Sequence, residues 1–146
     1  MEITNFNSNR GSIEKSINDK LKGTFLEYIE MKVDKVSEGH IEASIPFSLK
    51  VMRPEGKVLD GGLILSMIES VAGIGSMTLL DNDKYEVRGM QVNVNHVRGL
   101  TKGRAIAVAD IIHKGRLTHI WNVNVKSEEN KLISTGRVVN IVLSKQ

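Results

Sequence analysis

The amino-acid sequence predicts an α+β domain in which one long apolar helix is wrapped by a curved antiparallel sheet. The first observation is the segment GGLILSMIESVAGIGSMTLL between Asp60 and Asp81, which is dense in apolar residues and carries a single charge, Glu69. The second is that residues 87–143 read as four long strands separated only by short turns. One sheet cannot cover a helix that is apolar on nearly every side, so we expect a second copy of the chain to cover the rest.

The composition is that of one domain with an ordinary core. A chain of 146 residues can bury about two thirds of its unfolded surface. It contains no Cys, which excludes disulfides, thiolate nucleophiles and Cys-ligated zinc. The net charge of +3 is too small to indicate nucleic-acid binding, and neither the polar N-terminus nor the interrupted apolar segment indicates export or membrane spanning. We therefore expect a cytoplasmic protein without a nucleic-acid or membrane partner.

Residues 1–23 form a polar lead-in. Within it, Ile13, Ile17 and Leu21 recur at helical spacing, which predicts a short amphipathic helix. The lead-in is too short for a DNA-reading domain. Residues 24–146 contain no linker, repeat or low-complexity tract, so we expect them to form a single domain.

Two strands and a loop are predicted between this lead-in and the long helix. Residues 24–36 and 40–47 read as strands, joined by the turn at residues 37–39. Residues 50–59, which include Pro54, read as a loop that leads into the helix.

After the helix the sequence contains only strand patterns. The predicted strands exceed the average strand length, which indicates a strongly curved sheet; they cover residues 87–98, 104–113, 119–126 and 132–143. Strict alternation divides the first of them into two faces. The helix-facing side is expected to hold Met90, Val92, Val94 and His96, and the opposite side Gln91, Asn93 and Asn95.

Glu69, the one charge of the apolar helix, has two interpretations. Burying an ionised carboxylate without a partner is costly, and a desolvated carboxylate takes up a proton from water more readily than a solvated one. On this basis Glu69 is a candidate catalytic group. The alternative is a structural Glu that pairs with a buried Arg or His.

The positive charge is concentrated in residues 98–116. One acid, Asp110, is there outnumbered by five basic residues, which are Arg98, Lys102, Arg104, Lys114 and Arg116. Solvated strand ends are the default explanation for these charges. The alternative is a site for an anionic ligand such as a phosphorylated cofactor. No pair of His residues has convincing metal-ligand spacing, so no metal site is predicted.

Several motifs together resemble the hotdog-fold acyl-CoA thioesterases. Gly61-Gly62, with Glu69 nine residues after Asp60, is similar to that family's helix motif of one residue, two glycines and a later Asp or Glu. The resemblance covers residues 24–143. It includes the VNVNHVR string at residues 92–98, His113-Lys114-Gly115 with Trp121 downstream, and the closing strand at residues 132–143.

This resemblance implies a homodimer, or a dimer of dimers, that hydrolyses an acyl-CoA without a cofactor. The NVNHVR string is most similar to thioesterases acting on 1,4-dihydroxy-2-naphthoyl-CoA in menaquinone synthesis and to siderophore-pathway proofreading thioesterases, so an aromatic acyl group is expected, with dihydroxynaphthoyl-CoA as the best single candidate. Glu69 would act as base or nucleophile. The residues expected to contact substrate are His96, Gly73, Arg98, His113, Lys114, Gly115 and Arg116. For His96, a core histidine bonded to the backbone is the alternative.

The chemistry itself requires groups that lie far apart on one helix. The free amides of Gly61 and Gly62 at a helix N-terminus suit the oxyanion that develops during thioester hydrolysis, while a carboxylate activates water or attacks the carbonyl. Gly61 and Glu69 are eight residues apart, which is about 12 Å along a helix. Both can act on one carbonyl only if the helix N-terminus of one subunit meets Glu69 of the other, so we expect the site at a dimer interface.

Two positions depart from the family pattern. The nearest subfamilies have a His directly before the double glycine, where this chain has Asp60, and many members have a Gln or Asn where it has Pro54. Asp60 is also a strong helix N-cap. A non-catalytic acyl-CoA binding protein, its oxyanion site spoiled by Asp60, is therefore the alternative to an enzyme. A hotdog hydratase would need an Asp and His pair in residues 50–59, which contain neither.

Overall fold

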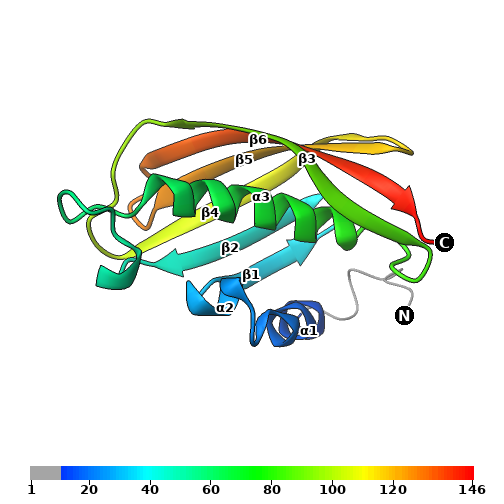
Figure 1. Ribbon diagram of the computed structural model, residues 1–146, viewed down its shortest axis with the longest axis horizontal. Coiled ribbons are helices and arrows are strands. Elements are labelled where there is room, and N and C mark those ends of the chain that lie inside the picture. The colour runs from blue at the N-terminus through cyan, green and yellow to red at the C-terminus, as the bar shows by residue number, and fades with distance from the viewer. Residues whose placement is uncertain (1–10) are drawn as a thin grey trace.

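A computed structural model describes residues 11–146 of the chain. Six antiparallel strands form one curved sheet in the order β1-β2-β4-β5-β6-β3, and helix α3 lies along its concave face (Figure 1). The strands are β1 (Lys32–Ser37), β2 (His40–Pro46), β3 (Tyr85–His96), β4 (Arg104–Lys114), β5 (Thr118–Ser127) and β6 (Leu132–Ser144). The predicted α+β class, the strand at residues 40–47 and the four strands after the helix are confirmed.

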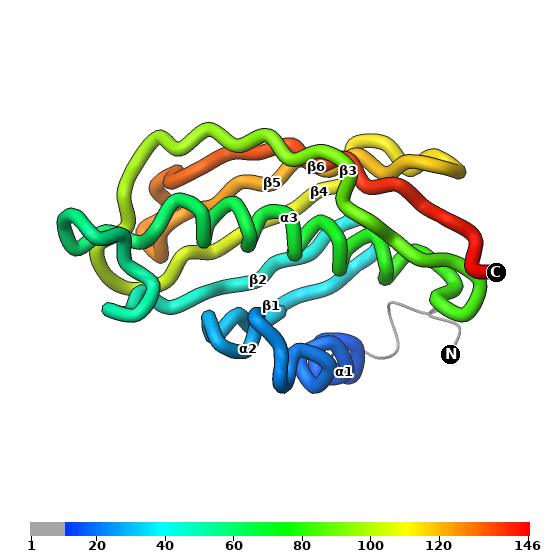
Figure 2. The backbone as a smooth tube through the Cα atoms, in the orientation of Figure 1, coloured from blue at the N-terminus to red at the C-terminus, as the bar shows by residue number. Residues whose placement is uncertain are grey.

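Helix α3 (Gly61–Met77) is the predicted apolar helix and forms the centre of the core. It begins at its N-cap Asp60, whose Oδ1 accepts a hydrogen bond of 3.0 Å from the Leu63 amide. One side of the helix is buried against the sheet, namely Leu63, Ile64, Met67, Ile68, Val71, Ala72, Gly75 and Ser76. Figure 2 shows α3 lying over the curved sheet, with β1 and β2 on one side of it and β3 on the other.

The prediction of a strand over residues 24–36 is wrong in its first half. A short helix, α2 (Phe25–Tyr28), stands there, and β1 begins only at Lys32. Thr24 caps this helix by accepting a hydrogen bond from the Leu26 amide, and the Glu27 carboxylate accepts one of 2.6 Å from the Gly23 amide. These local side-chain bonds give the backbone an alternative to strand pairing.

Helix α1 (Ser12–Leu21) lies where the spacing of its apolar residues predicted a helix, and it closes one edge of the sheet. Asn18 donates from Nδ2 to the Val33 carbonyl at 2.8 Å and accepts at Oδ1 from the Val33 amide at 2.8 Å. Glu14 accepts from the Val36 amide at 2.9 Å. The outward backbone groups of β1 are thus used by side chains of α1. Residues 1–10 of the predicted lead-in lie outside the described part of the chain.

Strand β3, at the opposite edge, contains a bulge that strict alternation could not anticipate. Its pairing with β6 shifts between Gly89 and Gln91, so Met90 is an extra residue. Because of the bulge, Gly89 and Val92 both face α3, and Met90, expected on the helix-facing side, is 57% exposed. The expectation for Met90 was therefore wrong, whereas Val92 and Val94 pack against the core as predicted.

A buried polar cluster joins α3 to the sheet. The Oγ atom of Ser76 accepts hydrogen bonds from Trp121 Nε1 at 2.8 Å and from Asn140 Nδ2 at 3.0 Å. Asn140 Nδ2 also lies 3.1 Å from the Ala72 carbonyl. These bonds use the Trp121 and Asn140 N–H donors, while Asn140 Oδ1 has no partner among the described residues, and they set the position of α3 over β5 and β6.

No helix within residues 11–146 is both long and apolar enough to cross a membrane.

Candidate active site

One stripe of α3 is left uncovered by the chain's own sheet. Leu65 is 38% exposed and Met77 is 43% exposed. Glu69, which lies between them in the helix, and Gly62, at its N-terminal end, are exposed as well. Gly73, half-buried on the same stripe, has no atom within 4 Å of the position a Cβ would take. The helix is therefore not buried all round within one chain, and Glu69 lies on the open side.

The Glu69 carboxylate lies against strand β3 at Gly89. An ideal Cβ built on Gly89 would stand 2.5 Å from Glu69 Oε1 and 3.4 Å from its Cδ. Neither a buried Arg nor a buried His pairs with Glu69 among the described residues, so the structural ion pair considered as an alternative is absent there. Glu69 is a carboxylate held at the surface of α3 beside an edge strand.

The first turn of α3 presents its backbone amides at the opposite end of the stripe. Gly61 and Gly62 occupy the first two helical positions, whose N–H groups have no partner within the helix. Asp60 Oδ1 is used by the Leu63 amide, and the same atom would stand 3.0 Å from a Cβ on Gly62. The N-cap role of Asp60 is thus present, and its negative charge sits directly beside the two glycine amides.

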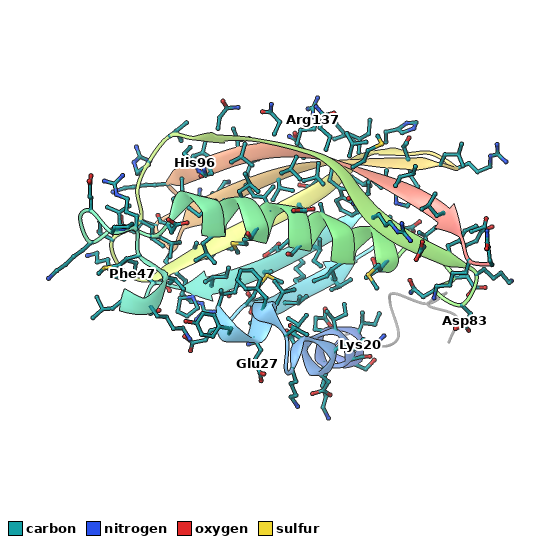
Figure 3. The ribbon with its side chains drawn as sticks, in the orientation of Figure 1. Lys20, Glu27, Phe47, Asp83, His96 and Arg137 are labelled. Carbon is teal, nitrogen blue, oxygen red and sulfur yellow. The ribbon has the colours of Figure 1, made fainter. Side chains whose placement is uncertain are left out.

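His96, at the end of β3, completes this group (Figure 3). Its Nε2 would be 3.2 Å from a Cβ on Gly61, so the absence of a side chain there lets the ring approach the helix. The other ring nitrogen, Nδ1, lies 2.7 Å from the Oγ of the buried Ser134. This is a side-chain bond, which excludes the backbone-bonded core histidine. If Ser134 donates to Nδ1, then Nε2 carries the proton and can donate toward a ligand.

Ser134 was not singled out from the sequence. The direct pairing of His96 with Ser134 across β3 and β6 brings the two side chains together. The signal that could have found it is this register, which requires knowing which strands are neighbours.

The basic residues predicted to bind phosphate fall into two separate groups within one chain. The Arg98 amide donates to the carbonyl of Ile133, near the start of β6. Lys114 pairs with His119 of β5, and His119 pairs with Asn140 of β6. Asn140 is seven residues after Ile133 on the same strand. Seven strand residues span roughly 23 Å. Arg98 and the β4–β5 hairpin therefore cannot reach the same phosphate group within one chain.

The hairpin itself gathers the other three candidates. Gly115 allows the His113 ring to fold over it, since a Cβ there would stand 2.5 Å from His113 Nε2. His113, Lys114 and Arg116 are all exposed, and Lys114 Nζ lies 3.9 Å from Glu38 Oε1. His113 lies across from Ile120 and Lys114 across from the buried His119, so these two side chains leave opposite faces of the sheet, and the prediction that the turn presents all three together is not met for this pair.

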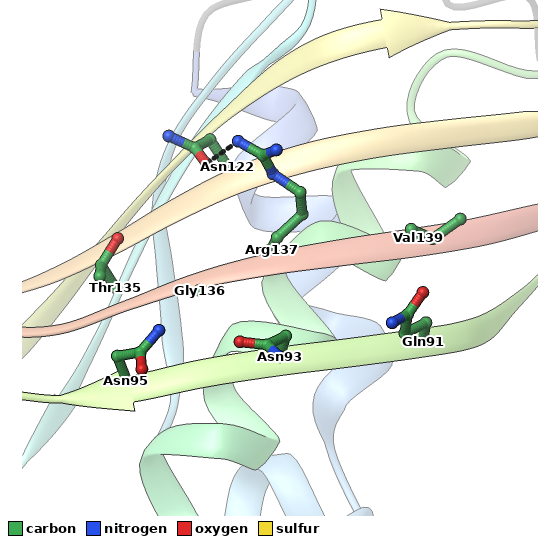
Figure 4. A pocket seen from close by; sticks show the side chains of 8 residues that line it. All are labelled: Gln91, Asn93, Asn95, Asn122, Thr135, Gly136, Arg137 and Val139. Carbon is green, nitrogen blue, oxygen red and sulfur yellow. Dashed lines mark hydrogen bonds between the residues drawn. The ribbon is translucent and has the colours of Figure 1, made fainter.

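An open groove of about 360 Å³ lies on the sheet face opposite to α3 (Figure 4). It is lined by Gln91, Asn93, Asn95, Asn122, Thr135, Gly136, Arg137 and Val139. Gln91, Asn93 and Asn95 therefore point away from the helix, as alternation predicted. Because the sheet separates this groove from Glu69 and from the first turn of α3, it is not part of the candidate active site.

A second histidine forms an ionic cluster between β2 and β4. His40 Nδ1 lies 2.6 Å from Asp110 Oδ1, and His40 Nε2 lies 2.9 Å from Glu42 Oε1. Partial burial favours the neutral ring, but the two carboxylates outweigh it and raise the pKa of His40. No group of three His, Asp or Glu side chains within residues 11–146 is arranged to hold a metal ion.

A helix wrapped by a six-stranded antiparallel sheet, with amides and a histidine at its N-terminus and a carboxylate two turns later, defines a hotdog-fold hydrolase. Comparison with known proteins agrees: the model of the thioesterase superfamily matches residues 56–134. The chain belongs to the thioesterase superfamily and is a thioester hydrolase.

Individual relatives extend the similarity to nearly the whole chain. A Pseudomonas aeruginosa relative is 30% identical over 127 residues, which are 87% of each chain. A 1,4-dihydroxy-2-naphthoyl-CoA hydrolase of Listeria monocytogenes is 29% identical over 120 residues, 82% of this chain and 96% of that one. The crystal structure of a mutant thioesterase from Pseudomonas aeruginosa superposes with a TM-score of 0.87 at 28% identity, covering 90% of this chain and 94% of the other.

Proposed function

We propose that the chain hydrolyses an acyl-CoA thioester at a site shared between two copies, in the cytoplasm. The observation that carries this proposal is the separation of the two chemical groups on α3. The Gly61 and Gly62 amides with His96 lie at its first turn, and Glu69 lies about 12 Å further along, against Gly89. Neither group alone accounts for hydrolysis, and one chain does not bring them to the same carbonyl.

The open edge of β3 supplies the contact that would unite them. This strand is 12 residues long, ends the sheet, and has no side chain of the described residues bonded to its backbone. A long unprotected edge favours pairing with another strand. Antiparallel pairing of two β3 strands about an axis between Val92 and Val94 brings His96 of one chain near Gly89, and hence Glu69, of its partner.

In this arrangement each group has one role. The amides of Gly61 and Gly62, with His96 Nε2–H, stabilise the oxyanion as the thioester carbonyl becomes tetrahedral. The partner's Glu69 removes a proton from water as the oxygen–carbon bond forms, and returns that proton to the sulfur as the carbon–sulfur bond breaks. The products are a carboxylic acid and free coenzyme A.

Direct attack by the partner's Glu69 on the carbonyl is the alternative, giving a mixed anhydride that water then opens. A single turnover in H₂¹⁸O can reveal an anhydride that water opens at the protein carboxyl, whereas opening at the acyl carbonyl labels the released acid just as water activation does. Water activation places ¹⁸O in the released acid in the first turnover. Opening of an anhydride at its protein carboxyl would instead place ¹⁸O in Glu69, which mass spectrometry of the active-site peptide would detect.

Shared sites can be tested by mixing two inactive variants. Random assembly of Glu69→Gln chains with Glu69-bearing His96→Ala chains makes about half of the dimers mixed. Each mixed dimer has one intact site and one site that lacks both groups. About a quarter of wild-type activity should therefore return. A site contained in one chain would recover none. Light scattering should give at least a dimer mass at micromolar concentration, and a monomer mass for active protein would refute the model.

The same dimer places the basic residues for coenzyme A. Since the β4–β5 hairpin aligns with Gly89 across the sheet, Arg98 of one chain and the hairpin of its partner come to the same end of the site. We infer that these two groups hold different phosphates of one coenzyme A. Arg116→Ala should then raise KM about tenfold with little change in kcat, and affinity should weaken with salt. An unchanged KM would remove Arg116 from the site.

The acyl group is proposed to be aromatic, with 1,4-dihydroxy-2-naphthoyl-CoA as the leading candidate. Support comes from the NVNHVR string and from the naming of the Listeria relative. Thiol release should be measured on benzoyl-CoA, a naphthoyl-CoA, acetyl-CoA and lauroyl-CoA. A higher kcat/KM on lauroyl-CoA than on both aromatic substrates would contradict the aromatic assignment while leaving hydrolysis intact.

A further inference from the structure

We propose that Gly89, together with the bulge at Met90, is a positioning element for the Glu69 carboxylate. This inference rests on the proposed function, because it assigns a role to Gly89 in the step that Glu69 performs. Gly89 touches no substrate atom in this scheme. It acts by leaving room on β3 for the carboxylate.

The Glu69 side chain fills the space that a side chain at position 89 would need. The three heavy atoms closest to an ideal Cβ on Gly89 are Oε1, Cδ and Cγ of Glu69, at 2.5, 3.4 and 3.6 Å. A real Cβ cannot approach an oxygen at 2.5 Å. Any residue other than glycine at position 89 must therefore displace the Glu69 side chain.

The bulge is what turns Gly89 toward the helix at this point. Met90 is the extra residue between Gly89, which pairs with Asn140, and Gln91, which pairs with Val139. Without it, the alternation that carries Val92 and Val94 to the core would bring the Met90 side chain to face α3 beside Glu69. The bulge instead leaves Met90 exposed and places a residue without a side chain opposite the carboxylate.

The physical cost of filling this space falls on Glu69 and not on the fold. Gly89 does not have the positive φ that would require glycine. Its would-be neighbour is the far end of a flexible, exposed side chain, which can rotate away without moving the backbone. We therefore expect Gly89→Ala to fold normally and to misplace the carboxylate.

The decisive experiment is a double-mutant cycle between Gly89→Ala and Glu69→Asp, with thiol release from benzoyl-CoA as the readout. Gly89→Ala should lower kcat on the order of 10²-fold, the scale for a displacement of about 1 Å, and change KM less than about threefold. The carboxylate of Glu69→Asp is one methylene shorter and does not reach the added methyl group. In that background Gly89→Ala should change kcat by less than about threefold.

Arg88→Ala is the matched control, because Arg88 precedes Gly89 on the same strand and, among the described residues, its side chain pairs with Glu86 on the surface. It should leave kcat unchanged. Equal losses from Gly89→Ala in both backgrounds would show that its effect does not pass through Glu69 and would overturn the proposal, even if the variant were less stable. Full activity in Gly89→Ala with an inactive Glu69→Gln would overturn only this positioning role, whereas full activity in Glu69→Gln would overturn the proposed function.

Discussion

The two edges of the sheet are treated differently by this chain. At one edge, β1 is six residues long, and Asn18 and Glu14 of α1 bond to its outward backbone groups. At the other edge, β3 is 12 residues long and no element of the described chain covers it. Natural proteins block sheet edges that must not pair. The contrast supports the proposal that the β1 edge is finished within one chain and that the β3 edge pairs with a second chain.

The groups to which we assign chemical roles gather at the open edge. Glu69 contacts Gly89 of β3, and His96 at the end of β3 meets the first turn of α3. The closed edge carries instead ion pairs and capping bonds that serve the fold, such as Lys35 with Glu42. Substitutions near β3 should therefore affect activity more than stability, and substitutions near β1 should do the reverse.

The largest expected effect is at the open edge. Glu69→Gln keeps the size of the side chain and removes its basicity, so kcat should fall by at least about 10²-fold, the scale for losing a general base. The unfolding midpoint in urea should stay the same, because Glu69 is exposed in the single chain. Glu86→Gln makes the same chemical change on the surface of β3, where Glu86 pairs with Arg88, and should leave kcat unaltered.

At the β1 edge, Asn18→Ala should have the opposite effect, lowering stability and leaving kcat unchanged. It removes both bonds to Val33 and exposes an edge that α1 had blocked, so the free energy of unfolding should fall by about 1–3 kcal/mol. Its kcat at a temperature where the protein is folded should match the wild type. Asp19→Ala is the control, since the ion pair that Asp19 forms within the described residues is with the exposed Lys22 on the surface of α1. A loss of kcat without loss of stability in Asn18→Ala would break the comparison between edges.

Asp60 affects both stability and the proposed catalysis, because it caps α3 beside the amides proposed to bind the oxyanion. A carboxylate there competes for the donors and repels the developing charge, so Asp60→His should raise kcat several-fold, less than the roughly 10²-fold cost of losing one oxyanion donor. Asp60→Asn keeps an N-cap of equal strength and removes only the charge, and should raise kcat without lowering stability. Lower activity in both variants would show that the carboxylate supports catalysis.

The smallest expected effect is a pH dependence of stability on the β1 side of the sheet. The pKa of His40 is raised in the folded protein. Its bonds to Asp110 and Glu42 therefore stabilise the fold fully below the unfolded pKa of 6.5, and this stabilisation is lost as the pH rises through the folded pKa. Burial, with the charges of Lys114 and His113 nearby, lowers the pKa of His119. The neutral His119 ring is therefore compatible with the fold above pH 6.5, and protonating it as the pH falls lowers the stability of the fold.

Urea unfolding measured from pH 5 to 9 can separate these two histidines. In His40→Gln the decline of stability above pH 6.5 should become shallower, while the decline on the acid side remains. The reverse result, with His40→Gln flattening the acid side, would contradict the assignment. Activity at pH 7 should be little changed, because His40 lies on the far side of the sheet from the candidate active site.

Local sequence patterns determined much of this protein. The apolar run with Asp60 before it and Glu69 within it predicted α3 and its cap, and alternation predicted five of the strands. The double glycine, Glu69 and His96 were singled out from the same patterns and from their resemblance to the thioesterases. Such features depend on residues within a few turns of each other, so the sequence alone can carry them.

Only the tertiary structure decided the features that depend on pairing between distant segments. The bulge at Met90 exists in the register of β3 against β6, and that register also brings Ser134 to His96 and separates Arg98 from the hairpin. The exposure of Glu69 depends on how far one sheet reaches around α3, and the blocked edge depends on α1 docking beside β1. These are relations between elements, which local periodicity does not encode.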